Sequence, residues 1–205
     1  MSLAENQINY RPMTANDIGK VPIGHQGTPD EVRHRINRLG SSAILAFDAE
    51  KHVGQLQFRH YDSGIRSPRG LWDPLYWGDF GEHAPRLPSR TLSVYCYHVG
   101  QLEDNDERDA SYQGRGIGLQ LLDLLLFWAE QQGFEAIVAK VTPTPRSVMG
   151  FMGGQAPRTY VDRGFNVFAT VVDSELKQIA RDRKLVGPGA NLEDAARISY
   201  CVKSL

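Results

Sequence analysis

Apolar and polar positions alternate, run together or recur with a helical period along most of the chain, and these patterns predict its secondary structure. Period-two alternation and short continuous apolar runs are typical of β-strands, and they occur at residues 8–12, 43–47, 53–61, 91–99, 134–141, 166–172 and 198–202. Apolar residues at helical spacing predict helices at 29–39, 117–132, 158–162 and 174–183. The sequence therefore predicts an α/β protein whose strands join in one sheet covered by helices.

The clearest helix boundary in the sequence lies at Thr28. This residue has the side chain of an N-cap, a proline follows it at the first helical position, and Glu31 can complete a capping box. Gly40 is placed to end the same helix. The next two apolar runs, 43–47 and 53–61, are separated by a short polar segment, so we expect them to pair as an antiparallel hairpin.

Residues 62–90 show no periodicity and form an aromatic and proline-rich insertion between two predicted strands. The insertion contains Trp72 and Trp77, which a solvated linker would not carry. We expect the two tryptophans to form a wall of the substrate site. The alternative is a loop that these aromatic side chains hold against the rest of the domain.

Composition and charge exclude several classes of protein. The chain has 205 residues, of which 41% are hydrophobic, so we expect one domain over residues 1–205. Lys and Arg number 23 against 24 Asp and Glu, and the formal net charge of -1 argues against nucleic acid or an anionic membrane as partner. The longest apolar run, near 119–129, is short and contains Asp123, so no membrane span is predicted.

The cysteines and histidines predict neither a disulfide framework nor a metal site. Cys96 and Cys201 are the only two cysteines, and the N-terminus lacks a basic and apolar leader, so we expect a cytoplasmic protein. The six histidines show no metal-ligand spacing, and we expect no metal. Cys96, inside a predicted strand, is interpreted as a small core residue.

A glycine-rich segment, residues 112–118, stands between a predicted strand and a predicted helix. Backbone N–H groups can converge there, the helix dipole favours an anion, and Arg115 adds a positive charge, so a phosphate-bearing ligand is indicated. A Walker loop would need lysine and a hydroxyl residue where Leu119 and Gln120 stand. A Rossmann loop would need a third glycine at Leu119 and an acidic residue closing a later strand, whereas Glu135 begins its strand.

The same loop resembles the pyrophosphate loop of the GCN5-related N-acetyltransferases (GNAT), Gln-x-x-Gly-x-Gly, with Gln113, Gly116 and Gly118 in the defining positions. A second segment, residues 156–165, is similar to the family's fourth-helix pattern, Ala-x-x-x-Tyr-x-x-x-Gly-Phe. Val53-Gly54 in the third predicted strand also resembles the family, and the order of elements matches across nearly the whole chain.

This resemblance implies a GNAT-like acyl-CoA acyltransferase fold, in which a mixed, mostly antiparallel sheet has helices on both faces. It also implies acetyl-coenzyme A (acetyl-CoA) as co-substrate, no metal, a pantetheine arm between the fourth and fifth strands, and direct attack of an amine on the thioester. The residues implied in coenzyme binding are Tyr97, Val99, Gln113, Gly114, Arg115, Gly116, Ile117 and Gly118.

Two residues are the candidates for proton transfer. Tyr160 matches the family's tyrosine that protonates the departing thiolate, although a packed helix aromatic is the alternative. His98, at the end of a predicted strand, is the candidate base, although it could be a surface histidine. Glu103 or Asp104 could instead accept the proton through water.

Three segments are longer than is usual in the family: 62–90, 101–111 and 143–154. Because of these segments, the resemblance does not identify the acceptor substrate. The second of these is acidic and could attract a cationic amine or be only a solvated surface. We expect transfer to a primary amine of a small molecule. An acyl-CoA-sensing module and a protein acetyltransferase acting on lysine or N-terminal amines are the alternatives, and the sequence leaves a homodimer open.

Overall fold

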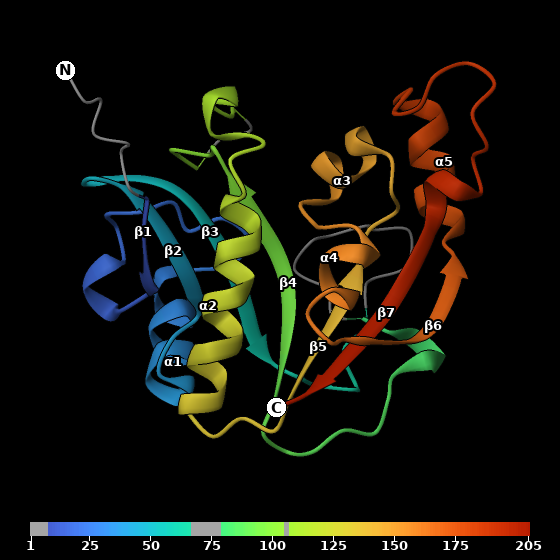
Figure 1. Ribbon diagram of the computed structural model, residues 1–205. Helices are drawn as coiled ribbons and strands as arrows, with labels where there is room; N and C mark the ends of the chain where they lie inside the picture. Colours follow the sequence, from blue (N-terminus) through green and yellow to red (C-terminus); the bar gives the residue numbers. More distant parts are fainter. Residues whose placement is uncertain (1–7, 67–78, 105–106) are drawn as a thin grey trace. The chain divides into compact units, whose positions relative to one another are not determined.

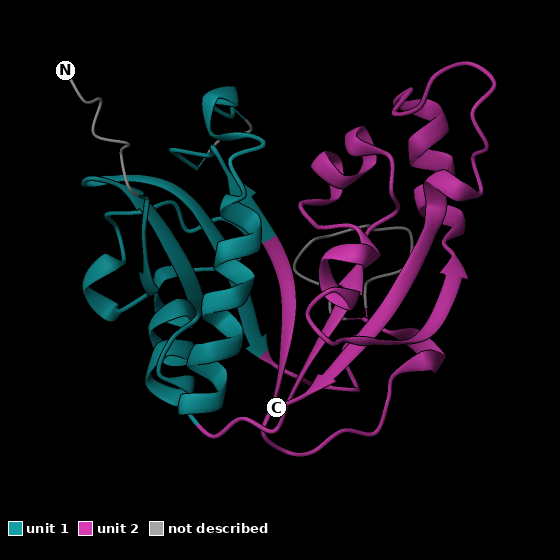
Figure 2. Ribbon diagram, in the orientation of Figure 1, with its two compact units in different colours: residues 1–59, 97–132 teal, residues 60–96, 133–205 magenta. Residues whose placement is uncertain are grey.

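The computed structural model describes residues 8–66, 79–104 and 107–205 (Figure 1). The chain divides into two compact units, residues 1–59 with 97–132 and residues 60–96 with 133–205 (Figure 2). Trp72 and Trp77, the predicted wall of the substrate site, lie outside the described residues.

The predicted strands and helices all occur, with boundaries shifted by a few residues at most. The strands are β1 (Ile8–Pro12), β2 (Ala43–Asp48), β3 (Lys51–His60), β4 (Thr91–Val99), β5 (Ala136–Val141), β6 (Asn166–Val172) and β7 (Arg197–Ser204). The α-helices are α1 (Pro29–Leu39), α2 (Ile117–Gln131), α3 (Arg146–Met152), α4 (Pro157–Val161) and α5 (Ser174–Asp182). Short 3₁₀ turns are η1 (Ala15–Asp17), η3 (Gly81–His83), η4 (Ala110–Tyr112) and η5 (Asp194–Ala196). Among the elements of the described residues, α3 and these short turns were not predicted.

The strands form a seven-stranded sheet in the order β1-β2-β3-β4-β5-β7-β6. β4 and β5 are parallel, and the pairs β1–β2, β2–β3, β5–β7 and β6–β7 are antiparallel. The predicted mixed, mostly antiparallel sheet is therefore confirmed. The parallel register joins Thr91–Val94 of β4 to Ala136–Ala139 of β5.

Residues close in sequence define the ends of helix α1 and the β2–β3 hairpin in the first unit. The Thr28 hydroxyl accepts a hydrogen bond from the Glu31 backbone N–H at 3.3 Å, and the Glu31 carboxylate accepts one from the Thr28 N–H at 2.7 Å, which completes the predicted capping box. Gly40 ends α1 with φ at +91°, a left-handed conformation that favours glycine. β2 and β3 pair as the predicted antiparallel hairpin. Helix α2 packs against β1 and β2 (Figure 1).

The second unit has its own core, and part of the predicted insertion belongs to it. Phe80 is 1% exposed, and its ring meets Tyr61 at 5.9 Å and Tyr200 at 5.2 Å, both edge-on. Leu176 of α5 and Ile198 of β7 are buried in the same cluster. This end of the insertion is therefore held by aromatic packing.

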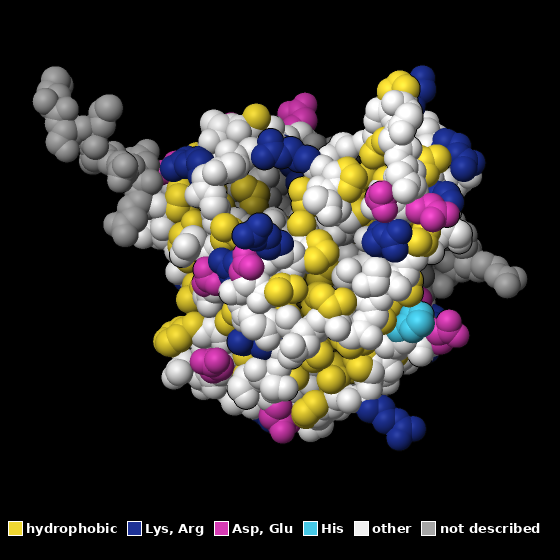
Figure 3. Space-filling model, turned by 45° about the vertical axis from the view of Figure 1, so that its right-hand side comes forward, with side chains coloured by type: hydrophobic (Ala, Val, Ile, Leu, Met, Phe, Trp, Pro, Cys, Tyr) yellow, Lys and Arg dark blue, Asp and Glu magenta, His cyan; other side chains and the backbone are white. Residues whose placement is uncertain are grey.

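The described surface is mixed, with apolar side chains among charged ones in the view of Figure 3. Its exposed large apolar residues are Leu119, Phe127, Val161, Val167, Phe168 and Val172. Within the described residues, no helix combines the length and the apolar character that a membrane crossing requires.

Candidate functional site

The glycine loop predicted to bind phosphate lies at the start of α2, in the first unit. Gly114 and Gly116 have φ angles of +74° and +76°, and a Cβ added to either would meet no atom within 4 Å. Gly116 is the N-cap of α2, and its carbonyl accepts hydrogen bonds from the N–H groups of Leu119 and Gln120. The loop is thus open to solvent, with left-handed glycines placed directly before the positive end of a helix. That arrangement suits an anion such as a pyrophosphate.

Tyr112 connects this loop to the rest of the first unit. Its hydroxyl donates a hydrogen bond to the Asp48 carboxylate at 3.1 Å. The Arg115 guanidinium lies 5.2 Å from the centre of the Tyr112 ring and the Lys51 ammonium 5.4 Å from it. Two exposed cations therefore flank the loop, where they can neutralise phosphate charge.

Gly54 of β3 lies against the end of β4 and beside the first residue of α2. A Cβ on Gly54 would lie 3.0 Å from the His98 carbonyl oxygen and 3.5 Å from the Ile117 side chain. A side chain at this position would crowd the His98 carbonyl of β4, so glycine allows β3 to approach the end of β4 closely. The first residue of α2 thus lies close to the point where β3 packs against the end of β4.

His98, the predicted base, is 2% exposed and lies on β4 in the first unit. Its ring centre is 4.9 Å from that of His25. Burial lowers the pKa of His98 to about 3, and the nearby charges of His25 and Arg108 act in the same direction, whereas a hydrogen bond with Gln101 opposes them. His98 is therefore a neutral imidazole rather than the surface histidine of the alternative interpretation.

The loop that carries His25 is held against β3 by two buried glutamines. The Gln55 side-chain amide donates a hydrogen bond to the Pro22 carbonyl at 2.8 Å, and the Gln57 amide donates to the Ile23 carbonyl at 3.1 Å. The Gln57 side-chain oxygen also accepts from the His25 N–H at 3.2 Å. These bonds fix the backbone that leads into His25.

Asp104 holds the same loop from the acidic segment. Its two carboxylate oxygens accept hydrogen bonds from the Ile23 N–H at 2.9 Å and the Gly24 N–H at 2.8 Å. Gly24 has φ at +58°, and a Cβ there would clash with Gln57 and lie 3.1 Å from Nε2 of His98. The loop backbone thus approaches His98 closely, and Asp104 serves to hold it there.

Sequence analysis missed His25, Gln55 and Gln57 as members of this site. The signal that could have identified them was the pair of glutamines inside the apolar run at 53–61, because a buried amide needs a partner. The glycine beside His25 was a second signal, since glycine often marks a close backbone approach.

The other predicted site residues are placed as follows. Tyr97 is 3% exposed and Val99 half-buried, both near the end of β4. Tyr160 lies on α4 in the second unit, where it is 1% exposed and its ring contacts Phe165 edge-on at 5.1 Å. Cys96 is 1% exposed, as expected for a core residue.

Comparisons with known proteins agree with this fold. No curated protein matches the sequence. Among solved structures, an arylalkylamine N-acetyltransferase-like protein of mosquito has a TM-score of 0.53 at 16% identity, covering 97% of this chain and 100% of that one. A putative acetyltransferase of Salmonella typhimurium, solved with its cofactor acetyl-CoA, has a TM-score of 0.52 at 14% identity, covering 97% and 94%. The sequence model of the acetyltransferase (GNAT) family matches residues 21–152, more than half of the chain, and the chain belongs to that family.

Proposed function

We propose that this protein is an N-acetyltransferase that moves an acetyl group from acetyl-CoA to a primary amine of a small molecule. The observation that carries the proposal is the open glycine loop at the start of α2, which lies in the same compact unit as a buried, neutral histidine on β4. Membership of the GNAT family supports the transfer of an acetyl group, and the Salmonella structure with bound acetyl-CoA supports the donor. We further propose that both units act as one catalytic domain.

The residues of the loop fit the pyrophosphate of acetyl-CoA. A Cβ at Gly114 or Gly116 would occupy the open space that we assign to the phosphates. The N–H groups of residues 114–118 would donate to the phosphate oxygens, and Arg115 would balance their charge. Backbone groups of Tyr97 and Val99 are the proposed donors to the pantetheine arm and the thioester carbonyl.

The proposed reaction is a direct acyl transfer. The amine nitrogen attacks the thioester carbonyl carbon, so a C–N bond forms and the C–S bond breaks. The proton lost by the amine passes to His98, whose buried ring is held neutral and is therefore in the form that accepts a proton. Half-buried His25, beside it, gives that proton a path to solvent. Tyr160 is the proposed donor of a proton to the departing thiolate.

The surroundings of His98 suggest a cationic or neutral acceptor. Acidic side chains follow β4 in the segment that carries Glu103 and Asp104. An acidic acceptor would be repelled by that segment, whereas an ammonium group would be attracted before it loses its proton. This is the reason for proposing an amine-bearing metabolite.

Binding of the donor is tested with a matched pair of glycine variants. Gly116→Asp places a carboxylate where the pyrophosphate is proposed to lie. Gly189→Asp is the control, because Gly189 also has a left-handed φ, +84°, and open surroundings. At a hundredfold excess over its dissociation constant, acetyl-CoA stabilises a protein by about 2.7 kcal/mol. We expect acetyl-CoA to raise the melting temperature of the parent and of Gly189→Asp but not that of Gly116→Asp. An equal rise in the melting temperature of all three proteins would contradict the loop assignment.

Catalysis is tested with a panel of primary amines, read out as thiol release from acetyl-CoA. Turnover with at least one small amine supports the proposal. Binding of acetyl-CoA without turnover of any small amine, but with acetylation of lysine peptides or N-terminal peptides, would show a protein acetyltransferase. Binding with no turnover of either class would show a sensing module.

A further inference from the structure

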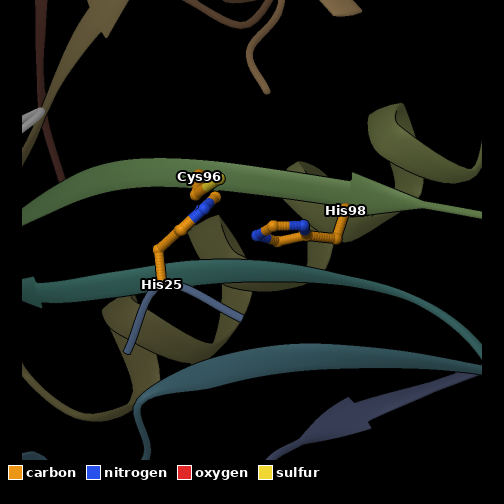
Figure 4. A group of neighbouring side chains, drawn as sticks. All are labelled: His25, Cys96 and His98. Carbon is orange, nitrogen blue, oxygen red and sulfur yellow. The ribbon is translucent and has the colours of Figure 1, made fainter. Parts of the chain in front are cut away.

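Three side chains with metal-binding atoms meet beside β4: His25, Cys96 and His98 (Figure 4). Each offers one ligand atom, and these atoms all lie within 4.8 Å of one another. Cys96 and His98 are two residues apart on one strand, so their side chains project from the same face. His25 comes from the loop before α1, and its imidazole points toward Cys96 (Figure 4).

The backbone around this cluster is well supported. Cys96 is joined to His98 by one continuous strand, and the strand itself fixes their separation. His25 is fixed by the hydrogen bond from its N–H to Gln57 and by the bonds of Asp104 to the two preceding residues. Three ligands are therefore presented by backbone that is already ordered.

We propose that His25, Cys96 and His98 bind a single Zn²⁺ ion. Zinc takes thiolate sulfur and imidazole nitrogen in tetrahedral geometry, at about 2.3 Å and about 2.0–2.1 Å. Those bond lengths correspond to ligand atoms about 3.4–3.6 Å apart. The three atoms lie within 4.8 Å of one another and need to close by at most about 1.4 Å, which rotation of the side chains can supply. The fourth position is left for water or a small ligand.

The chemistry of the three groups selects the class of metal. A metal ligand must be deprotonated, and burial keeps the His98 imidazole neutral. One sulfur and two nitrogens suit zinc and similar transition metals, whereas Mg²⁺ and Ca²⁺ require oxygen ligands. The proposed acetyl transfer assigns no role to Cys96, and the proposed site makes it a metal ligand. The site thus goes beyond the proposed function and does not depend on it.

The experiment is a titration of the metal-stripped full chain with Co²⁺, followed by displacement with Zn²⁺. A thiolate–cobalt charge-transfer band and tetrahedral d–d bands should saturate at one equivalent. Cys96→Ala should abolish the charge-transfer band. Loss of one ligand should weaken Zn²⁺ binding at least about 100-fold in Cys96→Ala and in His25→Gln, since even outer-shell changes cost 10–100-fold. Mg²⁺ should not displace the bound Co²⁺.

Matched controls separate this site from the chain's other ligands. Cys201→Ala removes the second buried thiol, and His34→Gln removes an exposed histidine from α1. Both should bind Co²⁺ and Zn²⁺ like the parent. The proposal is overturned if the parent shows no thiolate band at one equivalent, or if Cys96→Ala and Cys201→Ala behave alike.

Two further measurements keep the result decisive. The melting temperature of each variant without metal shows whether it is folded. If Cys96→Ala is unfolded, the His25→Gln variant tests the site instead, because His25 is only half-buried. Unchanged Zn²⁺ binding by His25→Gln overturns the proposal, and weakened Zn²⁺ binding supports it. The thermal shift with acetyl-CoA, measured on the same proteins, tests the donor site separately, so failure of one proposal leaves the other standing.

Discussion

Two buried histidines should make the stability of this protein fall between pH 7.5 and pH 5. His52 is 7% exposed and His98 is 2% exposed. Burial is the largest cause that lowers their pKa values, to about 4 for His52 and about 3 for His98, from an ordinary value of 6.5. Both side chains belong to the first unit.

The sign follows from which state binds protons. As the pH falls below 6.5, histidines of the unfolded chain take up protons, whereas these two stay neutral in the folded chain until about pH 4 and about pH 3. The free energy of unfolding therefore falls with falling pH throughout that window. At 1.36 kcal/mol per unit of pKa, each histidine costs about 2 kcal/mol between pH 7.5 and pH 5, or about 4 kcal/mol together.

Neighbouring charges do not reverse this expectation. Asp104 and Asp17 favour protonated His52, and their effect is already contained in its pKa of about 4. The pKa of Asp17 itself is lowered to about 2, so the stability that it contributes is lost only below about pH 4, outside the tested window. The change between pH 7.5 and pH 5 thus reports on the histidines.

The assay is urea unfolding at both pH values in the presence of a chelator, with two probes to test for a single transition. The parent should lose about 4 kcal/mol, and His52→Gln or His98→Gln should each lose about 2 kcal/mol over the same interval. His34→Gln, at an exposed position, should match the parent. A parent whose stability changes by less than about 1 kcal/mol, or a His98→Gln variant as sensitive as the parent, would refute the reasoning.

Three further predictions concern catalysis. Tyr160→Phe should lower kcat by about 10² or more while the acetyl-CoA thermal shift stays unchanged, and an unchanged kcat would assign Tyr160 to packing against Phe165. His98→Gln should lower kcat by about 10²–10⁴ in the same assay, and an undiminished kcat would remove it from the reaction. Trp72→Ala or Trp77→Ala should raise KM for the amine without changing acetyl-CoA binding, whereas earlier melting with unchanged KM would make both tryptophans structural.

Elements with local signals could be predicted from the sequence, and those without could not. Helix α1 has its N-cap, capping box and terminal glycine within one segment, and the structure confirms all of them. Helix α3 follows Pro145, which gives it no side-chain cap, and it contains Gly150. Its stability comes from burial of Val148 and Met152, which is a property of tertiary packing rather than of local sequence.

The candidate site shows the same division. The phosphate loop is contiguous, so its glycines could be identified from spacing alone, and the structure gives Gly114 and Gly116 the left-handed conformations that only glycine adopts readily. The surroundings of His98 are assembled from a loop, a neighbouring strand and the acidic segment. Each of these contributes polar groups whose partners are distant in sequence, and a single sequence does not show which will meet.

The burial of His98 both favours and limits its proposed role as a base. A low pKa keeps the ring neutral at every pH at which a cell works, and this is the form that either accepts a proton or binds a metal. The same low pKa makes His98 a weak base, so the proton that it receives must pass on quickly, and His25 is the neighbouring imidazole that can take it. A Zn²⁺ ion bound by both histidines would occupy the lone pairs that proton transfer needs. Metal binding and acetyl transfer are therefore expected to exclude each other, and turnover should be higher with a chelator than with added Zn²⁺.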